Sequence, residues 1–150
     1  MERTKGSVKM KNTIRYVQQE EIEQVRQYFK EKGDKGLLVE LWGEELRNWE
    51  QYSIKIGQLL QFPEMYQYPP RSHVFDAYLD WMEDLSWFKE VEEFAIIING
   101  YDSSFLSYDK SSKKMIVETF VTSVLPWWEY NVERCSVGGK AKPFNVYLVD

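Results

Sequence analysis

The sequence predicts an α/β fold in which a three-stranded parallel sheet is flanked by helices, with an extra helix near the N-terminus. Three short apolar runs are the first observation, because each is typical of a buried strand. The second is the length of the two connections between these runs, about fifty residues each, which suits the crossovers that parallel strands require. The third is the helical spacing of apolar residues within the connections.

The predicted strands lie at residues 37–42, 94–98 and 144–149. The first follows a glycine, Gly36, and the second is closed by the turn pair Asn99-Gly100. The third is the last apolar run of the chain. The first run is rich enough in apolar residues for a largely buried strand, and the second is apolar at every position, which indicates a strand covered on both faces.

Residues 18–33 are predicted to form the extra N-terminal helix. Their apolar positions Ile22, Val25 and Phe29 follow the i, i+3, i+7 spacing of one helix face, and Gly33 is a suitable end. Residues 1–15 carry five basic residues and little apolar content, so we expect a loose leader. The chain thus divides into an N-terminal extension, residues 1–35, and a main domain, residues 36–150.

Three further helices are predicted within the main domain, at about 49–60, 73–86 and 113–125. Each places its apolar residues on one side at a period of 3.6 residues. Pro126 is expected to break or kink the third of these helices, because proline lacks an N–H and its ring clashes with the preceding turn.

The 150 residues include 19 basic and 24 acidic ones, a net charge of −5, which argues against direct binding to nucleic acid. The longest apolar run, residues 94–98, is too short to span a membrane. The first residues lack the apolar stretch of a signal peptide, so we expect a cytoplasmic protein that does not contact membranes. A single cysteine, Cys135, excludes a disulfide within the chain.

The acidity is concentrated in residues 62–93, which hold eight acidic and two basic residues, a net charge of −6. Within the predicted helix at 73–86, four carboxylates gather on one side, at mutually repulsive i, i+3 and i+4 spacings, with no basic residue on the helix to relieve them. They are Asp76, Asp80, Glu83 and Asp84. This side of the helix is either a solvated surface or a surface for a cationic partner, and both interpretations stay open on periodicity alone.

The sequence favours neither catalysis nor a metal site. An exposed helix side offers no pocket that would separate the pKa values of two carboxylates. The single histidine, His73, stands beside Ser72 but lacks the other groups that a hydrolase needs. His73 and Cys135 are far apart in the sequence and have no metal-ligand spacing. We therefore expect no enzymatic activity, no metal and no cofactor.

Two segments resemble the barstar family of ribonuclease inhibitors. Residues 62–66 (FPEMY) and 75–88 (FDAYLDWMEDLSWF) are similar to the family's Leu-Pro-Glu-aromatic-aromatic stretch and to the acidic helix that follows it. The later strand, helix and final strand also follow the family's order. The resemblance covers roughly residues 36 to 150.

This resemblance implies a cytoplasmic immunity protein, or antitoxin, whose acidic helix blocks the cationic active site of a cognate ribonuclease toxin. Asp80 matches the family's dominant contact acid, Asp76 a second one, and Tyr66 an aromatic of the preceding loop. A late-helix glutamate of the family falls near Glu129, with Glu133 as the rival match. We expect the free chain to be a monomer.

The sequence also departs from the family's pattern. Met65, Val74 and Leu79 stand where the family has an aromatic residue, an asparagine and, in its prototype, a tryptophan. The loop at 67–73 is longer than usual. The target is therefore expected to be a nuclease other than barnase, and a nuclease of another fold is possible. The alternative is an interaction module of the same fold that binds another basic protein without inhibiting a nuclease.

Overall fold

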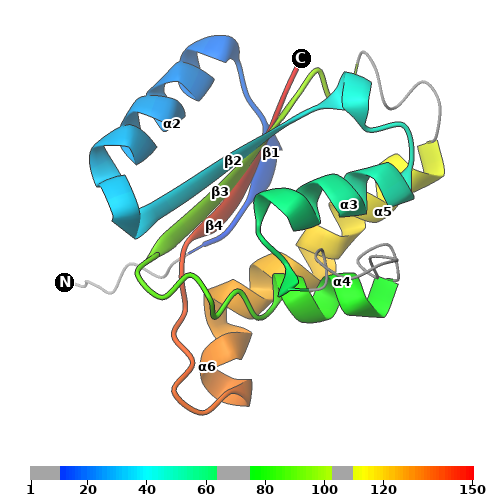
Figure 1. Ribbon diagram of the computed structural model, residues 1–150. Coiled ribbons are helices and arrows are strands. Elements are labelled where there is room, and N and C mark those ends of the chain that lie inside the picture. The colour runs from blue at the N-terminus through cyan, green and yellow to red at the C-terminus, as the bar shows by residue number, and fades with distance from the viewer. Residues whose placement is uncertain (1–10, 64–74, 103–109) are drawn as a thin grey trace.

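The computed structural model describes residues 11–63, 75–102 and 110–150, and it has the α/β architecture with a parallel sheet that the sequence predicts (Figure 1). Neighbouring strands pair in parallel in the spatial order β1-β4-β3-β2. The three predicted strands are all present, each within one residue of its expected bounds. The strands of the described residues are β1 (Ile14–Tyr16), β2 (Gly36–Trp42), β3 (Glu93–Asn99) and β4 (Phe144–Val149).

The prediction of three strands was wrong, because in the described residues the sheet has four. The additional strand, β1, begins in the segment expected to be a loose leader and pairs with the edge of β4, Ile14 opposite Val146. Asn12 holds it there. The Asn12 side chain donates to the carbonyls of Leu125 (3.1 Å) and Lys142 (3.3 Å) and accepts the N–H of Phe144 (3.0 Å).

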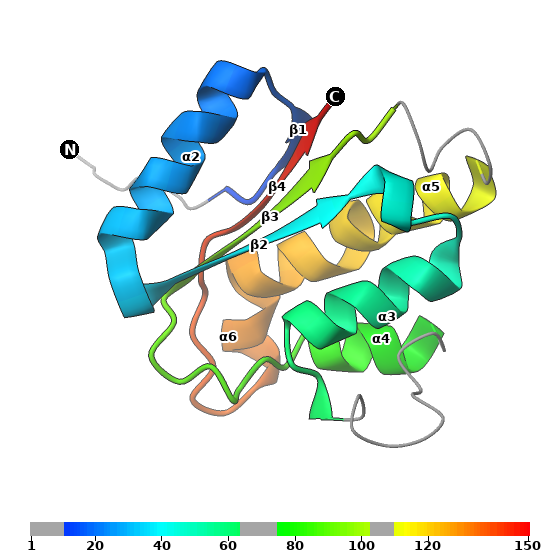
Figure 2. The same ribbon diagram turned by 45° about the horizontal axis from the view of Figure 1, so that its top comes forward.

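Helices cover both faces of the sheet (Figures 1 and 2). The predicted N-terminal helix is confirmed as α2 (Gln19–Lys32), which lies alone on one face among the described elements. The opposite face carries α3 (Trp49–Leu59) and α5 (Lys110–Thr119), and both views place α4 (Phe75–Met82) farther from the strands than α3. Within the described part of the chain, every helix is too short or too polar to cross a bilayer.

The core has two parts, because successive strand residues point to opposite faces. The larger part fills the space between the sheet and α3, α4 and α5, with Phe94, Ile96 and Ile98 of β3 at its centre. The smaller part lies under α2, where Ile97 and Val149 meet Ile22. A buried central strand therefore explains why β3 is apolar at consecutive positions.

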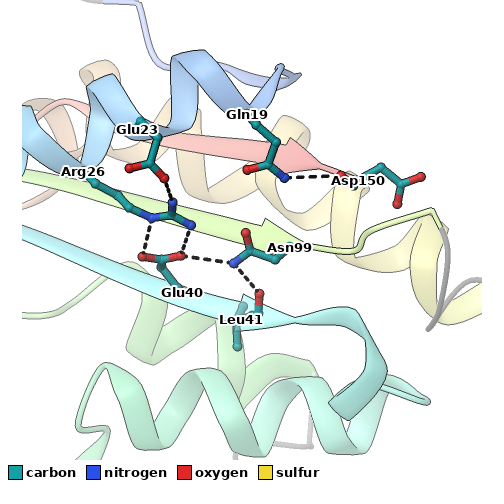
Figure 3. A network of polar contacts seen from close by, with 7 residues as sticks. All are labelled: Gln19, Glu23, Arg26, Glu40, Leu41, Asn99 and Asp150. Atoms are coloured by element: carbon teal, nitrogen blue, oxygen red, sulfur yellow. Dashed lines mark hydrogen bonds and ion pairs between the residues drawn. The ribbon is translucent and has the colours of Figure 1, made fainter.

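A polar network fixes α2 on the sheet (Figure 3). Arg26 of α2 donates from Nε and Nη2 to the two carboxylate oxygens of Glu40 on β2, at 3.0 and 2.9 Å. Asn99 donates to the same carboxylate (3.1 Å) and to the carbonyl of Leu41 (3.2 Å). The hydrogen bonds from Arg26, helped by Asn99, hold the pKa of Glu40 below its ordinary value against the opposing effect of burial.

Two helix ends differ from the prediction. The helix expected at 73–86 ends at Met82, and the chain then turns, with Leu85 buried in the left-handed region at φ 51°. The break that Pro126 could cause does not occur, because helical turns continue through Pro126 to Cys135 and end with α6 (Val132–Cys135). π-Helical turns, which are wider than α-helical ones, precede and follow Pro126. We infer that the helix continues because these wider turns leave room for the proline ring beside the preceding turn.

Candidate protein-binding surface

Helix α4 presents one side to the core and the other to solvent, as its periodicity predicts. Tyr78 and Met82 are fully buried, whereas Asp76 and Asp80 are exposed. The predicted apolar and acidic sides are therefore assigned correctly for these four residues. The apolar side is what decides how the acidic residues are displayed.

Buried hydrogen bonds hold α4 in place. The hydroxyl of Tyr78 lies 2.7 Å from that of Tyr52 on α3 and 3.3 Å from the Thr119 hydroxyl on α5. Burial raises the pKa of Tyr78 to about 12, so this hydroxyl stays protonated at physiological pH. At the other end of the helix, the indole N–H of Trp128 donates to the Met82 carbonyl (2.8 Å). Helix α4 is thus tied to three other segments.

The predicted acidic residues lie on α4 and on the turn that follows it. Glu83 still donates its N–H to the Leu79 carbonyl (2.9 Å), which keeps it in helical register with Asp80. Glu83 is half-buried, and burial together with the charge of Asp80 raises the pKa of its carboxyl. Asp84 is exposed and accepts the N–H of Ser86 (3.2 Å). We call Asp76, Asp80, Glu83 and Asp84 the acidic face.

No lysine or arginine of the described residues forms an ion pair with the acidic face. Other acidic residues of the chain do have such partners. Ion pairs join Arg26 to Glu40, Lys35 to Glu92 and Lys113 to Asp102. The negative charge of α4 is therefore uncompensated by the described part of the protein, and it is displayed on a helix that is held rigidly from behind.

An aromatic side chain borders the acidic face, and the sequence analysis missed it. Helical periodicity places Phe75 on the apolar side of its helix, but 42% of the residue is exposed. Its ring lies 5.9 Å from that of Trp49, which packs at 4.9 Å from Tyr78. The helical angle alone could not separate Phe75 from Tyr78, because both fall on the same side and only the position of α3 decides which is covered. Exposed aromatic rings beside charges are common anchors at protein interfaces.

The remaining predicted contact residues are placed elsewhere or lie outside the described residues. Glu129 is half-buried and accepts the N–H of Asn12 (2.7 Å), while its neighbour Trp128 is the residue that reaches α4. The rival, Glu133, is exposed and accepts the N–H of Ala141 (3.0 Å). In this structure both carboxylates therefore serve the protein's own backbone. Tyr66 lies outside the described residues.

Comparison of the chain with protein-family models, with curated proteins and with solved structures gave no match. The described residues contain no group of three or more histidine, cysteine, aspartate or glutamate side chains that could hold a metal ion. The acidic face has the charge to attract a cationic surface and, with Phe75, an apolar border to pack against it. Its chemistry suits recognition of a basic macromolecule.

Proposed function

We propose that this protein is an immunity protein, or antitoxin, that inhibits a cognate ribonuclease by placing the acidic face of α4 in the active site of the enzyme. The observation that carries the proposal is the set of four carboxylates, Asp76, Asp80, Glu83 and Asp84, that no described cation compensates. Charge left unpaired on a rigid element is expected where a partner supplies the opposite charge. The inhibitor itself performs no chemistry.

A ribonuclease is a suitable partner because its active site must attract and hold the phosphates of RNA. Carboxylates on a helix can occupy the positions of those phosphates and pair with the same arginine, lysine or histidine side chains. The exposed charge accelerates the encounter, and desolvated charge pairs slow the release. Inhibition then results from exclusion of the substrate.

The resemblance to the barstar family supports the same assignment. Asp76 and Asp80 match contact acids of that family, and both are exposed here on the outer side of α4. The order of elements from α4 through β3 and α5 to β4 is the order that the resemblance implies. The barstar-like identity of the domain is part of this proposal, together with the cytoplasmic location and the one-to-one complex with a toxin.

The test replaces single acids and measures inhibition. Affinity capture on the immobilised full chain, with mass spectrometry, supplies the cognate enzyme. Asp80→Ala is then expected to weaken binding by about 2 to 5 kcal/mol, or roughly thirty-fold to several thousand-fold, because it leaves a buried cation of the enzyme unpaired. Asp76→Ala is expected to cost less. Titration of nuclease activity with each variant measures the loss.

The matched control is Glu20→Ala, which removes an exposed acid from α2 on the other side of the sheet and is expected to leave inhibition unchanged. Thermal melts should show that all three variants fold. If Asp80→Ala inhibits as well as the parent protein, the assignment of α4 is wrong. If the captured partner is a basic protein without nuclease activity whose binding still needs Asp80, the chain is an interaction module of another kind.

A further inference from the structure

A cavity of about 510 Å³ opens at the carboxyl ends of β1 and β4, beside α5. The chain leaves β1 toward α2 on one face of the sheet and leaves β3 toward α5 on the other face (Figures 1 and 2). Open parallel sheets bind their ligands outside the carboxyl ends of their strands, and the cavity lies at this edge of the sheet. The volume also falls within the range of small-molecule sites.

The floor of the cavity is apolar and its rim is basic. Side chains of both packed strands and of α5 form the floor, and three lysines of the first turns of α5 stand at the rim together with Glu118. The apolar and aromatic residues of the lining are Ile14, Tyr16, Tyr101, Val117 and Leu148. The cavity could therefore hold a molecule with an apolar body and a polar end.

Tyr101 lines the cavity with a ring that the fold packs and a hydroxyl that it does not use. Only 1% of the residue is exposed, and its hydroxyl has no hydrogen-bond partner among the described residues. A buried hydroxyl without a partner destabilises the protein, because it has lost its hydrogen bonds to water. Burial raises the pKa of Tyr101 well above its ordinary value, so the hydroxyl remains a proton donor at physiological pH. A ligand that accepts this hydrogen bond would remove the destabilisation.

The basic rim favours an anion. Lys113 pairs with Asp102 (3.0 Å) and lies over the ring of Tyr101, 4.7 Å from its centre, and Lys114 reaches Glu118 at 3.9 Å. Lys110, at the start of α5, forms no ion pair with another described residue. The positive end of the α5 dipole adds to its charge.

We propose that this cavity binds a small organic anion, with its apolar body on Ile14, Val117 and Leu148 and its anionic group at the lysine rim beside the Tyr101 hydroxyl. A carboxylate, phosphate or sulfonate shares the required chemistry. The site lies on a different part of the molecule from the acidic face and does not depend on the proposed inhibition of a nuclease.

The probe is 1-anilinonaphthalene-8-sulfonate, which joins an aromatic body to one negative charge, and N-phenyl-1-naphthylamine serves as its uncharged counterpart. The folded full chain is expected to bind one equivalent of the sulfonate saturably and to bind the uncharged compound at least about tenfold more weakly. Amide chemical-shift changes in the NMR spectrum are expected to centre on Tyr16, Tyr101, Lys113 and Val117.

Two variants test the named contacts. Tyr101→Phe removes only the hydroxyl and is expected to weaken sulfonate binding about fivefold, the value of one hydrogen bond, while thermal stability stays equal or rises. Lys110→Glu is expected to weaken binding about five- to tenfold, and Lys30→Glu, the same charge change on α2, is expected to have no effect. The proposal is overturned if the sulfonate does not bind saturably or if the chemical-shift changes centre elsewhere. It is also overturned if the two compounds bind equally well, or if neither Tyr101→Phe nor Lys110→Glu weakens sulfonate binding.

Discussion

At the scale of single residues, two glutamates lie in opposite electrostatic environments. Glu40 receives hydrogen bonds from Arg26 and Asn99, which lower the pKa of its carboxyl. Glu83 is half-buried beside Asp80 without a compensating cation among the described residues, and the pKa of its carboxyl is raised. The ionised carboxylate of Glu40 therefore stabilises the fold, whereas the surroundings of Glu83 oppose ionisation of its carboxyl.

Glu83→Gln is expected to raise the free energy of unfolding at neutral pH by a few tenths of a kcal/mol, because it removes a like-charge pair at i, i+3 spacing. The pKa of the Glu83 carboxyl is higher in the folded protein than in the unfolded chain. Its destabilising contribution therefore grows as the pH rises from the unfolded pKa through the folded pKa, and it is absent at lower pH. Urea denaturation at pH 3.5 and at pH 7 measures the difference. A variant that is less stable than the parent at pH 7 would contradict this account.

Glu40→Gln is the opposite case and is expected to lower stability at neutral pH by about 1 kcal/mol, the difference between charged and neutral hydrogen bonds. The folded pKa lies below the unfolded one, so the stabilisation is present above the unfolded value and disappears as the pH falls through the folded value. Parent and variant should therefore converge in acid. The same denaturation series checks this, and a constant difference at all pH values would show that the charge is unimportant.

At the scale of elements, the position of α4 depends on hydroxyls buried behind it. Tyr78 contacts Tyr52 of α3 and Thr119 of α5, and these contacts lie on the side of the helix opposite Asp76 and Asp80. The buried side of α4 thus anchors the helix to the core, and the opposite side exposes the acidic residues to solvent. This separation predicts that stability and binding can be changed independently.

Tyr78→Phe is expected to lower the free energy of unfolding by about 1 to 3 kcal/mol, because the buried Tyr52 hydroxyl loses its partner. Binding of the proposed nuclease partner by the folded protein should change little. Calorimetric melts and nuclease titration at a temperature well below the transition measure the two effects. Asp80→Ala is the matched comparison, because it is expected to weaken binding while leaving stability unchanged. If Tyr78→Phe binds as poorly as Asp80→Ala, stability and binding do not depend on separate sides of α4.

At the scale of the whole molecule, the charge distribution is expected to govern the rate of association. The acidic face combines with a net charge of −5 to attract a basic partner over a distance that salt shortens to about 8–10 Å near physiological ionic strength. The association rate constant should fall about tenfold or more from low to moderate salt, while the dissociation rate constant changes far less. Stopped-flow measurement tests this, and a flat association rate would mean that the acidic face is only solvated.

The N-terminal region is expected to be needed for folding of the whole molecule. A fragment of residues 36–150 lacks β1 and α2, which exposes Ile97 and Val149 and leaves the edge of β4 unpaired. Such a fragment should unfold with little cooperativity, measured by circular dichroism during heating. A cooperative transition close to that of the full chain would show that residues 1–35 are a dispensable extension.

The sequence by itself determined the elements whose signals lie in consecutive residues. The apolar runs at 37–42, 94–98 and 144–149 predict the strands, and the 3.6-residue spacing separates Asp76 and Asp80 from the buried side of α4. These signals are local, because burial of a strand or of one helix side imposes its period on the residues in question.

Only the tertiary structure decided features that depend on distant partners. Strand β1 is three residues long, too short for a periodic signal, and Asn12 positions it through Phe144, 132 positions away. The same is true of Glu129, whose carboxylate is committed to the backbone of Asn12 by a contact across 117 positions. The exposure of Phe75 depends on where α3 packs. Contacts between segments so far apart follow from how the whole chain packs, and no local pattern encodes them.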